Sequence, residues 1–335
     1  MAMALKPAAS AADAQRVTHR PRTVLTAVLV GAALLSAAPA SARIQIGISE
    51  QSPGVFANKY FGPLKMRYGR IVVPWDVATL HGYWPRYLSA WLAGAKFDNV
   101  EPHVAFGVRA LTPRYYGKGP SPAQYAKAIR AFRKRWPHVH VFSPWNEENH
   151  VFQVTAKHPR LAVEYYKALK RICPFCRVLG ADMLDDQNLS KWLRRYQAYA
   201  RQYKIHPRVW GLHNYQDANH HRSFKTSWTY KLTKLVKGDI WSTEAGGLVG
   251  FKTVTGRIAY RYSPTRARKA QHYLFTLMAN PKVRARYKRV YVYNFFGSWS
   301  LHKRTNRWDS GLIGLNGKPR PAYADLKKII AANAR

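Results

Sequence analysis

The sequence has 335 residues and is strongly basic, with 55 lysines and arginines against 16 aspartates and glutamates and a formal net charge of +39. Such a charge attracts polyanions, whether cell-wall polymers, acidic polysaccharides or nucleic acids, without saying which of them. Its two cysteines are too few for a structural zinc site, which needs four ligands.

Residues 1–42 have the layout of a secretory signal peptide, in which basic residues precede an apolar segment at 24–38 and the small-residue run AAPASA follows it. The apolar segment is short for a membrane-spanning helix, although an uncleaved anchor is the alternative. We expect cleavage after Ala42, or else after Ala40, to give a secreted or cell-envelope protein. No transmembrane segment is expected in residues 43–335.

From Arg43 onward, short apolar runs alternate with longer amphipathic ones. Eight runs predict β-strands, at 44–48, 70–75, 100–108, 139–145, 177–182, 209–215, 239–244 and 289–296. Helical patterns occupy 122–136, 159–172, 189–203, 263–280 and 321–333. This alternation predicts an α/β fold, a (β/α)8 barrel in one domain at 43–335. A doubly wound open sheet is the alternative, but no glycine-rich dinucleotide loop follows any strand.

Two carboxylates lie at the ends of predicted strands, where the catalytic residues of a barrel belong. Glu147 follows the fourth strand in VFSPWNEEN, and Glu244 ends the seventh in DIWSTE. Side chains alternate along a strand, so Ser143, Trp145 and Glu147 are expected to share the face toward the barrel axis. The same alternation groups Ile240, Ser242 and Glu244.

A pair of carboxylates across a pocket is what cleavage of a glycosidic bond requires. A separation of about 5 to 5.5 Å gives a retaining mechanism, and about 6.5 to 9.5 Å an inverting one. Taken singly, each glutamate also fits a local role, Glu244 in helix capping and Glu147 in a turn. Their joint position at strand ends favours the catalytic interpretation.

The motifs PWNEEN and WSTEAGG resemble the acid/base and nucleophile motifs of the clan A glycoside hydrolases, retaining (β/α)8 enzymes that include families 5 and 39. RIVVPW is similar to the second strand of the clan and LHNY to its sixth. The ending WDSGLIGLNGKPRPAYADLK resembles the last strand loop and helix of members similar to family 39. The resemblance covers nearly all of residues 43–335.

The resemblance implies roles for six residues. Glu147 would be the acid/base, Glu244 the nucleophile, and Asn146 the group that binds the sugar's 2-hydroxyl. Arg70, His213 and Tyr215 would belong to the substrate-binding site, with Arg70 and the Tyr215 hydroxyl stabilising the ionised form of Glu244. A Trp-lined pocket would raise the pKa of Glu147, as a general acid requires. The resemblance implies neither a cofactor nor a metal.

The sequence departs from the clan pattern at two points, since Glu148 replaces the usual proline after the acid/base and Ala-Gly-Gly follows Glu244. The family within the clan, the sugar and its linkage therefore stay open. The aromatic platform after the eighth strand stays open between Phe295, Phe296 and Trp299.

Further aromatic, histidine and acidic residues fit either a binding site or a structural role. Trp75 and Trp299 are expected to bind sugar, and the remaining tryptophans to fill the core. The histidine pairs lack a third ligand at a zinc spacing, so no metal site is predicted; these are His138, His140, His220 and His221. The loop ADMLDDQN offers Asp182, Asp185 and Asn188 either as substrate contacts or as a cap for the next helix.

The cysteines of CPFC, Cys173 and Cys176, predict a local disulfide at the end of a helix, as suits an exported chain. A redox dithiol is the alternative, but it needs a thiol at a helix N-terminus after a strand, and here a helical pattern precedes the pair.

The sequence thus predicts a secreted retaining glycoside hydrolase acting on a carbohydrate. A non-catalytic carbohydrate-binding protein of the cell envelope is the alternative. Basic residues concentrate only modestly, at 130–135, 257–269 and 282–289, so solvated helix faces explain most of the charge. We expect weak electrostatic contact with anionic cell-wall polymers and no specific nucleic-acid partner, because no basic and aromatic recognition motif is present.

Overall fold

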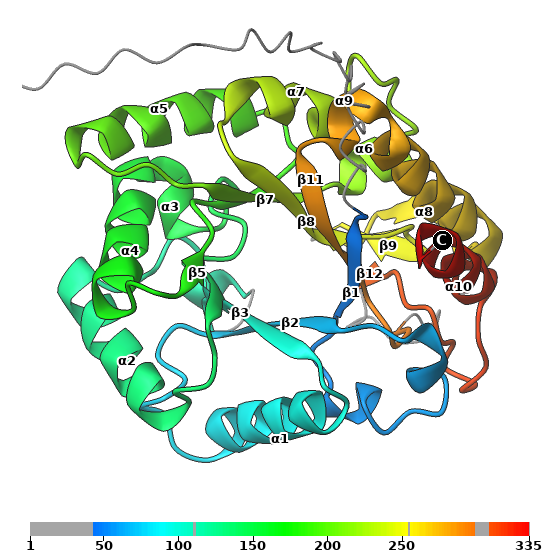
Figure 1. Cartoon of the computed structure of the whole chain (residues 1–335), viewed down its shortest axis with the longest axis horizontal. Helices are drawn as coiled ribbons and strands as arrows, with labels where there is room; N and C mark the ends of the chain where they lie inside the picture. The colour runs from blue at the N-terminus through cyan, green and yellow to red at the C-terminus, as the bar shows by residue number, and fades with distance from the viewer. Residues whose placement is uncertain (1–42, 110–111, 254, 299–307, 335) are drawn as a thin grey trace, which may run out of the picture. The chain divides into compact units, whose positions relative to one another are not determined.

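The computed structural model describes residues 43–109, 112–253, 255–298 and 308–334, and its main feature is a ring of parallel strands surrounded by helices (Figure 1). The described part contains one nine-stranded sheet with the order β5-β4-β3-β2-β1-β11-β8-β7-β6. Every neighbouring pair in this sheet is parallel. Its strands are β1 Gln45–Ser49, β2 Tyr68–Pro74, β3 Glu101–Gly107, β4 Val141–Ser143, β5 Arg177–Val178, β6 Asp182–Leu184, β7 Val209–His213, β8 Asp239–Ala245 and β11 Tyr287–Tyr293.

The sheet closes on itself through the short segment that joins β5 to β6, the two strands at its edges. Leu179 N donates to Phe142 O in β4 at 2.9 Å, while Gly180 N donates to Val209 O in β7 at 2.7 Å. One stretch of chain therefore pairs with both edges. A Cβ on Gly180 would lie 2.4 Å from Cβ of Pro207, so only glycine fits here. The predicted strand at 177–182 is both β5 and β6, and closure confirms a (β/α)8 barrel over the open-sheet alternative.

Helices form the outer layer of the ring, and the sequence marks where several of them begin. Ser121 caps α2 in a reciprocal capping box with Gln124, and Ser263 caps α8. The predicted helices are confirmed to within a residue or two. Within the described residues the helices are α1 Tyr83–Phe97, α2 Pro122–Arg135, α3 Val154–Lys157, α4 Pro159–Ile172, α5 Leu189–Gln202, α6 Tyr215–Asn219, α7 Trp228–Leu235, α8 Pro264–Ala279, α9 Pro281–Arg284 and α10 Pro321–Ala334. None of them is both long and apolar enough to cross a membrane.

Buried side chains fill two zones, one inside the ring and one between the ring and its helices. Inside, Val141, Trp241 and Tyr291 pack together. The outer zone contains large aromatic residues such as Trp145, which is fully buried. Burying a side chain of this size contributes about 1.5 to 3 kcal/mol to folding, so these two zones hold the strand ends in place.

A small antiparallel sheet, absent from the predictions, lies beyond the end of β8. It has the order β10-β9-β12, with β9 at Gly250–Lys252, β10 at Ile258–Tyr260 and β12 at Trp308–Asp309. Its strands are two or three residues long, below the length at which an alternating pattern can be recognised. It carries Trp308 toward the ends of the barrel strands, as described below.

The two cysteines are joined in a disulfide directly after α4. Cys173 is the C-cap residue of α4, and its Cα lies 5.3 Å from that of Cys176. Lys170 of the last turn donates to the carbonyl oxygens of Pro174 and Cys176. The bridge thus fixes the turn that leads from α4 into β5.

Candidate active site

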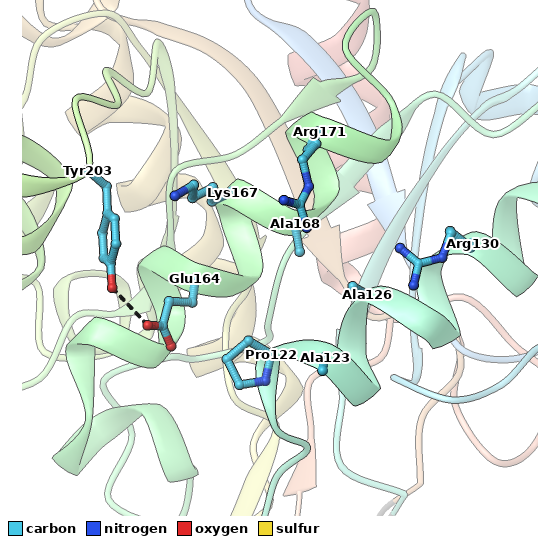
Figure 2. Close-up of a pocket in the computed structure, with 9 residues that line it drawn as sticks. All are labelled: Pro122, Ala123, Ala126, Arg130, Glu164, Lys167, Ala168, Arg171 and Tyr203. Atoms are coloured by element: carbon cyan, nitrogen blue, oxygen red, sulfur yellow. Dashed lines mark hydrogen bonds between the residues drawn. The ribbon is translucent and has the colours of Figure 1, made fainter.

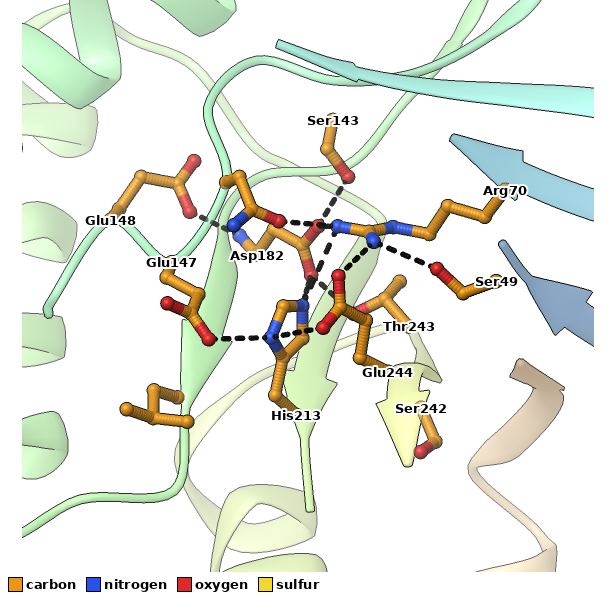
Figure 3. A network of polar contacts seen from close by, with 12 residues as sticks. Ser49, Arg70, Ser143, Glu147, Glu148, Asp182, His213, Ser242, Thr243 and Glu244 are labelled. Atoms are coloured by element: carbon orange, nitrogen blue, oxygen red, sulfur yellow. Dashed lines mark hydrogen bonds and ion pairs between the residues drawn. The ribbon is translucent and has the colours of Figure 1, made fainter. Parts of the chain in front are cut away.

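Arg70 organises the polar cluster at the centre of the barrel (Figure 3). Its guanidinium is fully buried; Nη1 donates to Glu244 Oε1 at 2.5 Å and to Ser49 Oγ at 3.3 Å. Nη2 donates to Asn146 Oδ1 and to Asp182 Oδ2, both at 2.7 Å. Burial lowers the pKa of Arg70, but the charges of Asp182 and Glu244 raise it by a larger amount, so the guanidinium is always charged. It links strands β2, β6 and β8 with the loop after β4.

Glu244 is held on both carboxylate oxygens. Oε1 accepts from Arg70 and Oε2 from the Tyr215 hydroxyl at 3.2 Å, and Nδ1 of His213 lies 3.7 Å from Oε2. The residue is 7% exposed. Two donors and a nearby imidazole fix the carboxylate in one orientation while leaving one edge open to solvent.

A β-bulge in β8 turns Glu244 toward the site. Leu212 of β7 pairs with Ser242, yet His213 pairs with Glu244, so β8 has one residue more than its neighbour. Before the bulge, Ile240 packs in the outer zone, whereas Trp241 packs inside the ring. The expectation that Ile240, Ser242 and Glu244 share one axis-facing side is therefore wrong, because the extra residue changes the alternation.

Glu147 reaches the site through an unusual backbone conformation rather than through strand alternation. β4 ends at Ser143, and Trp145 points into the outer zone, so the expected common face of Ser143, Trp145 and Glu147 ends with the strand. Glu147 has a φ of 53°, in the left-handed region that residues other than glycine rarely adopt. Such backbone strain occurs preferentially at functional sites. It directs the Glu147 carboxylate toward His213 and Glu244.

The two carboxylates approach each other closely. Oxygens of Glu147 and Glu244 and a ring nitrogen of His213 all lie within 4.8 Å of one another. The Glu147 side chain is 16% exposed and its Oε1 is 3.1 Å from His213 Nδ1. At this separation one carboxylate can attack a carbon atom while the other, which exchanges a proton with the cationic donor between them, protonates the oxygen that leaves that carbon.

His213 is an imidazolium ion, because acidic groups surround it. Its Nε2 donates to Asp182 Oδ1 at 3.2 Å, and its Nδ1 donates to Glu147. Burial lowers the pKa of His213, but Glu244 and Asp182 outweigh burial and raise the pKa to about 10. The site therefore contains two buried cations, Arg70 and His213.

The pKa of Glu147 is lowered rather than raised. Burial raises it, but the hydrogen bond and the charge of His213 lower it by more. The predicted raised pKa of Glu147 is therefore wrong. Trp145 fills the core, as was expected of the tryptophans other than Trp75 and Trp299: it is fully buried and donates its indole N–H to Gln153 in the outer zone.

Glu148, the next residue, has a structural position. Its Oε2 accepts from Asp182 N at 2.5 Å, its own N–H donates to Asp182 O, and its carbonyl accepts from Thr155. It is fully buried, and burial followed by the charge of Asp182 raises the pKa of Glu148 well above its usual range. Glu148 thus fastens the loop after β4 to β6, and its carboxyl group is turned toward the backbone N–H of Asp182 (Figure 3).

Asp182, in the loop after the fifth predicted strand, was expected either to contact substrate or to cap the next helix, and it does neither. Asp182 is fully buried, and its carboxylate accepts from Arg70, His213, Ser143 and Thr243. The two cations among these donors, Arg70 and His213, keep the pKa of Asp182 well below its usual range despite burial.

The other two residues of that loop have different positions. Asp185 accepts from the backbone N–H groups of Gln216 and Asp217 in the first turn of α6. It therefore caps α6 rather than the expected α5. Asn188 is the N-cap residue of α5 but makes no side-chain capping bond.

All six residues to which the resemblance assigned roles come together in one network. Arg70 is at its centre, and the others are Asn146, Glu147, His213, Tyr215 and Glu244. Trp75 lies outside this network, half-buried at the edge of the outer zone. Trp299 lies outside the described residues. Phe295 is fully buried against Phe61, so it offers no open aromatic face.

Sequence reasoning missed two aromatic residues beside Glu244. Tyr293 ends β11, and burial and the charge of Glu244 raise its pKa. Trp308 of β12 packs edge-on against Tyr215, with ring centroids 4.6 Å apart. Both are only partly buried. The end of the strand RVYVY was the available signal for Tyr293, and for Trp308 the signal was its place at the start of the ending WDSGLIGLNGKPRPAYADLK.

The donor set of Glu147, His213 and Glu244 has the spacing of a metal site, but its charges suit a proton better. His213 would have to lose a proton held at a pKa of about 10 before it could bind a metal. Arg70 already contacts Glu244. The second such group, His140 with the two cysteines, has its sulfur atoms in the disulfide.

Several solved structures share this fold at low sequence identity. A family 39 glycoside hydrolase from the gut symbiont Bacteroides cellulosilyticus WH2 is 15% identical, with a TM-score of 0.58 over 87% of this chain, which spans 64% of that enzyme's length. A glycoside hydrolase of family 5, subfamily 18, from Streptomyces cattleya in complex with GlcNAc is 15% identical, with a TM-score of 0.63 and coverage of 88% and 81%. A thermostable mutant of a xylanase from Cellvibrio japonicus is 11% identical, with a TM-score of 0.62 and coverage of 87% and 98%.

No protein-family model and no curated protein matches the sequence. Identities of 10 to 15% across the structural matches leave the fold as the shared property. The solved structures that share the fold include enzymes of families 5 and 39, the families that the motifs resemble. The chain therefore has the (β/α)8 fold of the clan A glycoside hydrolases.

Proposed function

We propose that the protein is a retaining glycoside hydrolase with Glu244 as nucleophile and Glu147 as acid/base. The observation that carries the proposal is the approach of the two carboxylates to within 4.8 Å at the C-terminal ends of the barrel strands. A retaining mechanism places them about 5 to 5.5 Å apart, too close for a water molecule to attack from between them.

In the first step, an oxygen of Glu244 attacks the anomeric carbon as the glycosidic C–O bond breaks. The departing oxygen takes a proton from Glu147, and a covalent glycosyl-enzyme remains. Arg70 and Tyr215 orient Glu244, so that little rearrangement precedes attack. Asn146, held by Arg70, is within the same cluster and is assigned to the sugar's 2-hydroxyl.

The lowered pKa of Glu147 makes His213 the resting holder of the catalytic proton. A sugar oxygen bound beside Glu147 excludes water and favours its neutral form, so the proton moves from His213 Nδ1 to Glu147 Oε1 along their 3.1 Å hydrogen bond. In the second step Glu147 removes a proton from water, which attacks the anomeric carbon and releases Glu244.

The ionised Glu147 also supports the second candidate, a carbohydrate-binding protein without catalysis. A carboxylate paired with an imidazolium is a good acceptor for sugar hydroxyl groups and does not by itself require proton transfer. In that case the two glutamates would contribute to affinity, and substrates would be bound without being cleaved.

The deciding experiment is to mix the protein with a panel of aryl glycosides and cell-wall polysaccharides, and to follow product release, anomeric configuration by NMR, and intact mass. A glycosyl adduct on Glu244 and a product of retained configuration are expected. An inverted product would overturn the retaining mechanism. Polysaccharide binding with no turnover across the panel would favour the second candidate.

Export belongs to the proposal as well. The disulfide between Cys173 and Cys176 supports an oxidising compartment, in agreement with a signal peptide at residues 1–42. N-terminal sequencing of the exported protein should begin at Arg43. Retention of Met1 in the exported protein would contradict the proposed cleavage.

A further inference from the structure

A groove lies on the outer wall of the barrel, between α2 and α4 (Figure 2). Its volume is about 400 Å³. Small side chains leave the space open, since Ala126 and Ala168 face each other across the helix pair and are 5% and 6% exposed. Arg130 from α2 and Lys167 and Arg171 from α4 surround this apolar floor.

The acidic residue of this groove is already occupied. Glu164 Oε1 accepts from Arg160 Nε at 3.0 Å and from the Tyr203 hydroxyl at 2.9 Å. Figure 2 shows the Glu164 and Tyr203 pair at one end of the groove, apart from Arg130 and Arg171. Among the described residues, no acidic side chain forms an ion pair with Arg130, Lys167 or Arg171. The groove therefore offers three cations to an external anion.

The three helices on this side of the barrel share the same imbalance. Together α2, α4 and α5 carry thirteen lysines and arginines and a single acidic residue, Glu164. They lie next to one another around the ring (Figure 1). This face includes the concentration of basic residues predicted at 130–135, and its net positive charge attracts polyanions toward the groove.

We propose that the groove is a second, non-catalytic binding site for an acidic polysaccharide that bears a carboxylate on its sugar rings. The planar guanidinium groups of Arg130 and Arg171 match the geometry of a carboxylate, and Lys167 adds a third donor. The alanine floor receives the C–H face of the sugar ring. The choice of a sugar polymer rests on the proposed function.

The aromatic residue of the groove argues against nucleic acid. Stacking of bases on open aromatic faces is the usual way to hold a single strand. The ring of Tyr203 has Lys167 Nζ 4.7 Å from its centroid and Arg160 Cζ 5.9 Å from it, and its hydroxyl is bonded to Glu164. In a uronate polymer, by contrast, every charge is fixed on a ring, so charge and apolar surface enter the groove together.

The test compares two triple variants that remove the same charge. Arg130→Gln with Lys167→Gln and Arg171→Gln changes the groove, whereas Lys269→Gln with Lys327→Gln and Lys328→Gln changes α8 and α10. Affinity for polygalacturonate is measured by affinity electrophoresis at several salt concentrations. The groove variant should lose about tenfold or more, because charge-assisted bonds are removed, and the α8 and α10 variant at most about threefold. Equal losses would overturn the proposal in favour of diffuse attraction.

A second variant changes shape without changing charge. Ala123 is exposed on α2 in the lining of the groove, so Ala123→Leu fills it at little cost to the helix. Ala331→Leu on the exposed face of α10 is its control. A several-fold loss with Ala123→Leu alone is expected, and no loss would refute a built site. A larger effect on single-stranded DNA or polyphosphate than on polygalacturonate would assign the groove to another polymer.

Hydrolysis of an aryl glycoside by the groove variants separates this proposal from the proposed function. The groove lies on the helix layer and the carboxylates at the strand ends, so the groove variants should keep the wild-type rate on a small substrate. Groove binding without any hydrolase activity would leave this site in place and remove the catalytic assignment. Hydrolase activity without any loss of polygalacturonate affinity in the groove variants would keep the catalytic assignment and remove the second binding site.

Discussion

Two buried arginines occupy the two ends of the barrel interior, and their surroundings differ in kind. Arg70 is bonded to the carboxylates of Glu244 and Asp182, whose side chains are 9% and 0% exposed. Arg289, near the N-terminal ends of the strands, has a single acidic partner, Glu101, which is 42% exposed. Its guanidinium instead lies over aromatic rings, Cζ being 3.8 Å from the centroid of Tyr68 and 4.2 Å from that of Trp241.

Arg70 therefore positions charged groups, whereas Arg289 mainly fills space between aromatic rings. Arg70 holds two carboxylates close together, and the Glu244 side chain is the partly exposed one of the two. Cation–π contacts hold Arg289 in place at the opposite end of the barrel, where Glu101 is its one acidic partner among the described residues. In barrels of this type, catalysis belongs to the C-terminal end of the strands and stability to the other. Removing the acidic partner of each arginine should therefore give opposite results.

Glu244→Ala should have the largest effect on turnover. The nucleophile is lost, no glycosyl-enzyme can form, and the rate should fall by roughly four powers of ten or more. Glu101→Ala is the matched control, since it also removes a carboxylate 2.5 Å from a buried arginine. Stopped assays with an activated aryl glycoside measure both. A Glu101→Ala variant as inactive as Glu244→Ala would break the comparison between the two ends.

Glu147→Ala should have a smaller effect that depends on the leaving group. Poor leaving groups need a proton on the departing oxygen and should lose roughly 10² to 10⁴ in rate, whereas activated ones should be affected far less in the first step. Azide should then restore turnover and give a glycosyl azide of retained configuration. The measurement is a series of aryl glycosides of graded leaving-group pKa.

Glu148→Gln is the control for that series. Burial raises the pKa of Glu148 well above its usual range, so an amide of the same shape should leave the leaving-group dependence unchanged. If Glu148→Gln showed the dependence and Glu147→Ala did not, the acid/base assignment within the motif would be wrong.

The fold and the identity of the two carboxylates were predictable from the sequence because both depend on local patterns. Alternating strands and helices, together with PWNEEN and WSTEAGG at strand ends, sufficed for a barrel and for the prediction of Glu147 and Glu244. The path by which these two carboxylates meet was not predictable. It depends on the bulge in β8 and on the left-handed conformation of Glu147, neither of which has a sequence signature here.

The electrostatics of the site were predicted only in part, because pKa values depend on partners that are distant in the sequence. Arg70 beside Glu244 followed from the motifs. Asp182 at the centre of the cluster did not, and without Asp182 the charge of His213 and the lowered pKa of Glu147 cannot be anticipated. Trp308 was missed for a similar reason, since it reaches Tyr215 through a two-residue strand.

His213→Gln should change the pH dependence of turnover more than its maximum. In the wild type the proton shared by His213 and Glu147 is lost toward pH 10, so activity should persist into the alkaline range. Glutamine removes the group that lowers the pKa of Glu147, which must then hold the proton alone as a carboxylic acid. The alkaline limb of the profile of kcat/KM against pH should therefore move to lower pH.

The same residue predicts how stability depends on pH. The pKa of His213 is raised in the folded state from 6.5 to about 10, so its contribution to stability is complete below pH 6.5 and is lost as the pH rises toward 10. The melting temperature of the wild type should fall across this range, and less so in His213→Gln. In the activity measurement, an alkaline limb of the kcat/KM profile that does not move in His213→Gln would mean that His213 does not take part in proton transfer.

Arg289→Met tests the packing role of Arg289, and it should have the smallest effect on turnover. Methionine keeps part of the volume between Tyr68 and Trp241 but loses the bonds to Gln45, Tyr291 and Glu101. Because Glu101 is partly exposed, it can be solvated, and the loss of stability should be about 1 to 3 kcal/mol rather than the roughly 3 to 5 kcal/mol of a broken buried pair. Urea unfolding measures this loss, while kcat per folded molecule should stay at the wild-type value. A fall in kcat with unchanged stability would mean that the two ends of the barrel are coupled, and that Arg289 helps to position the carboxylates above it.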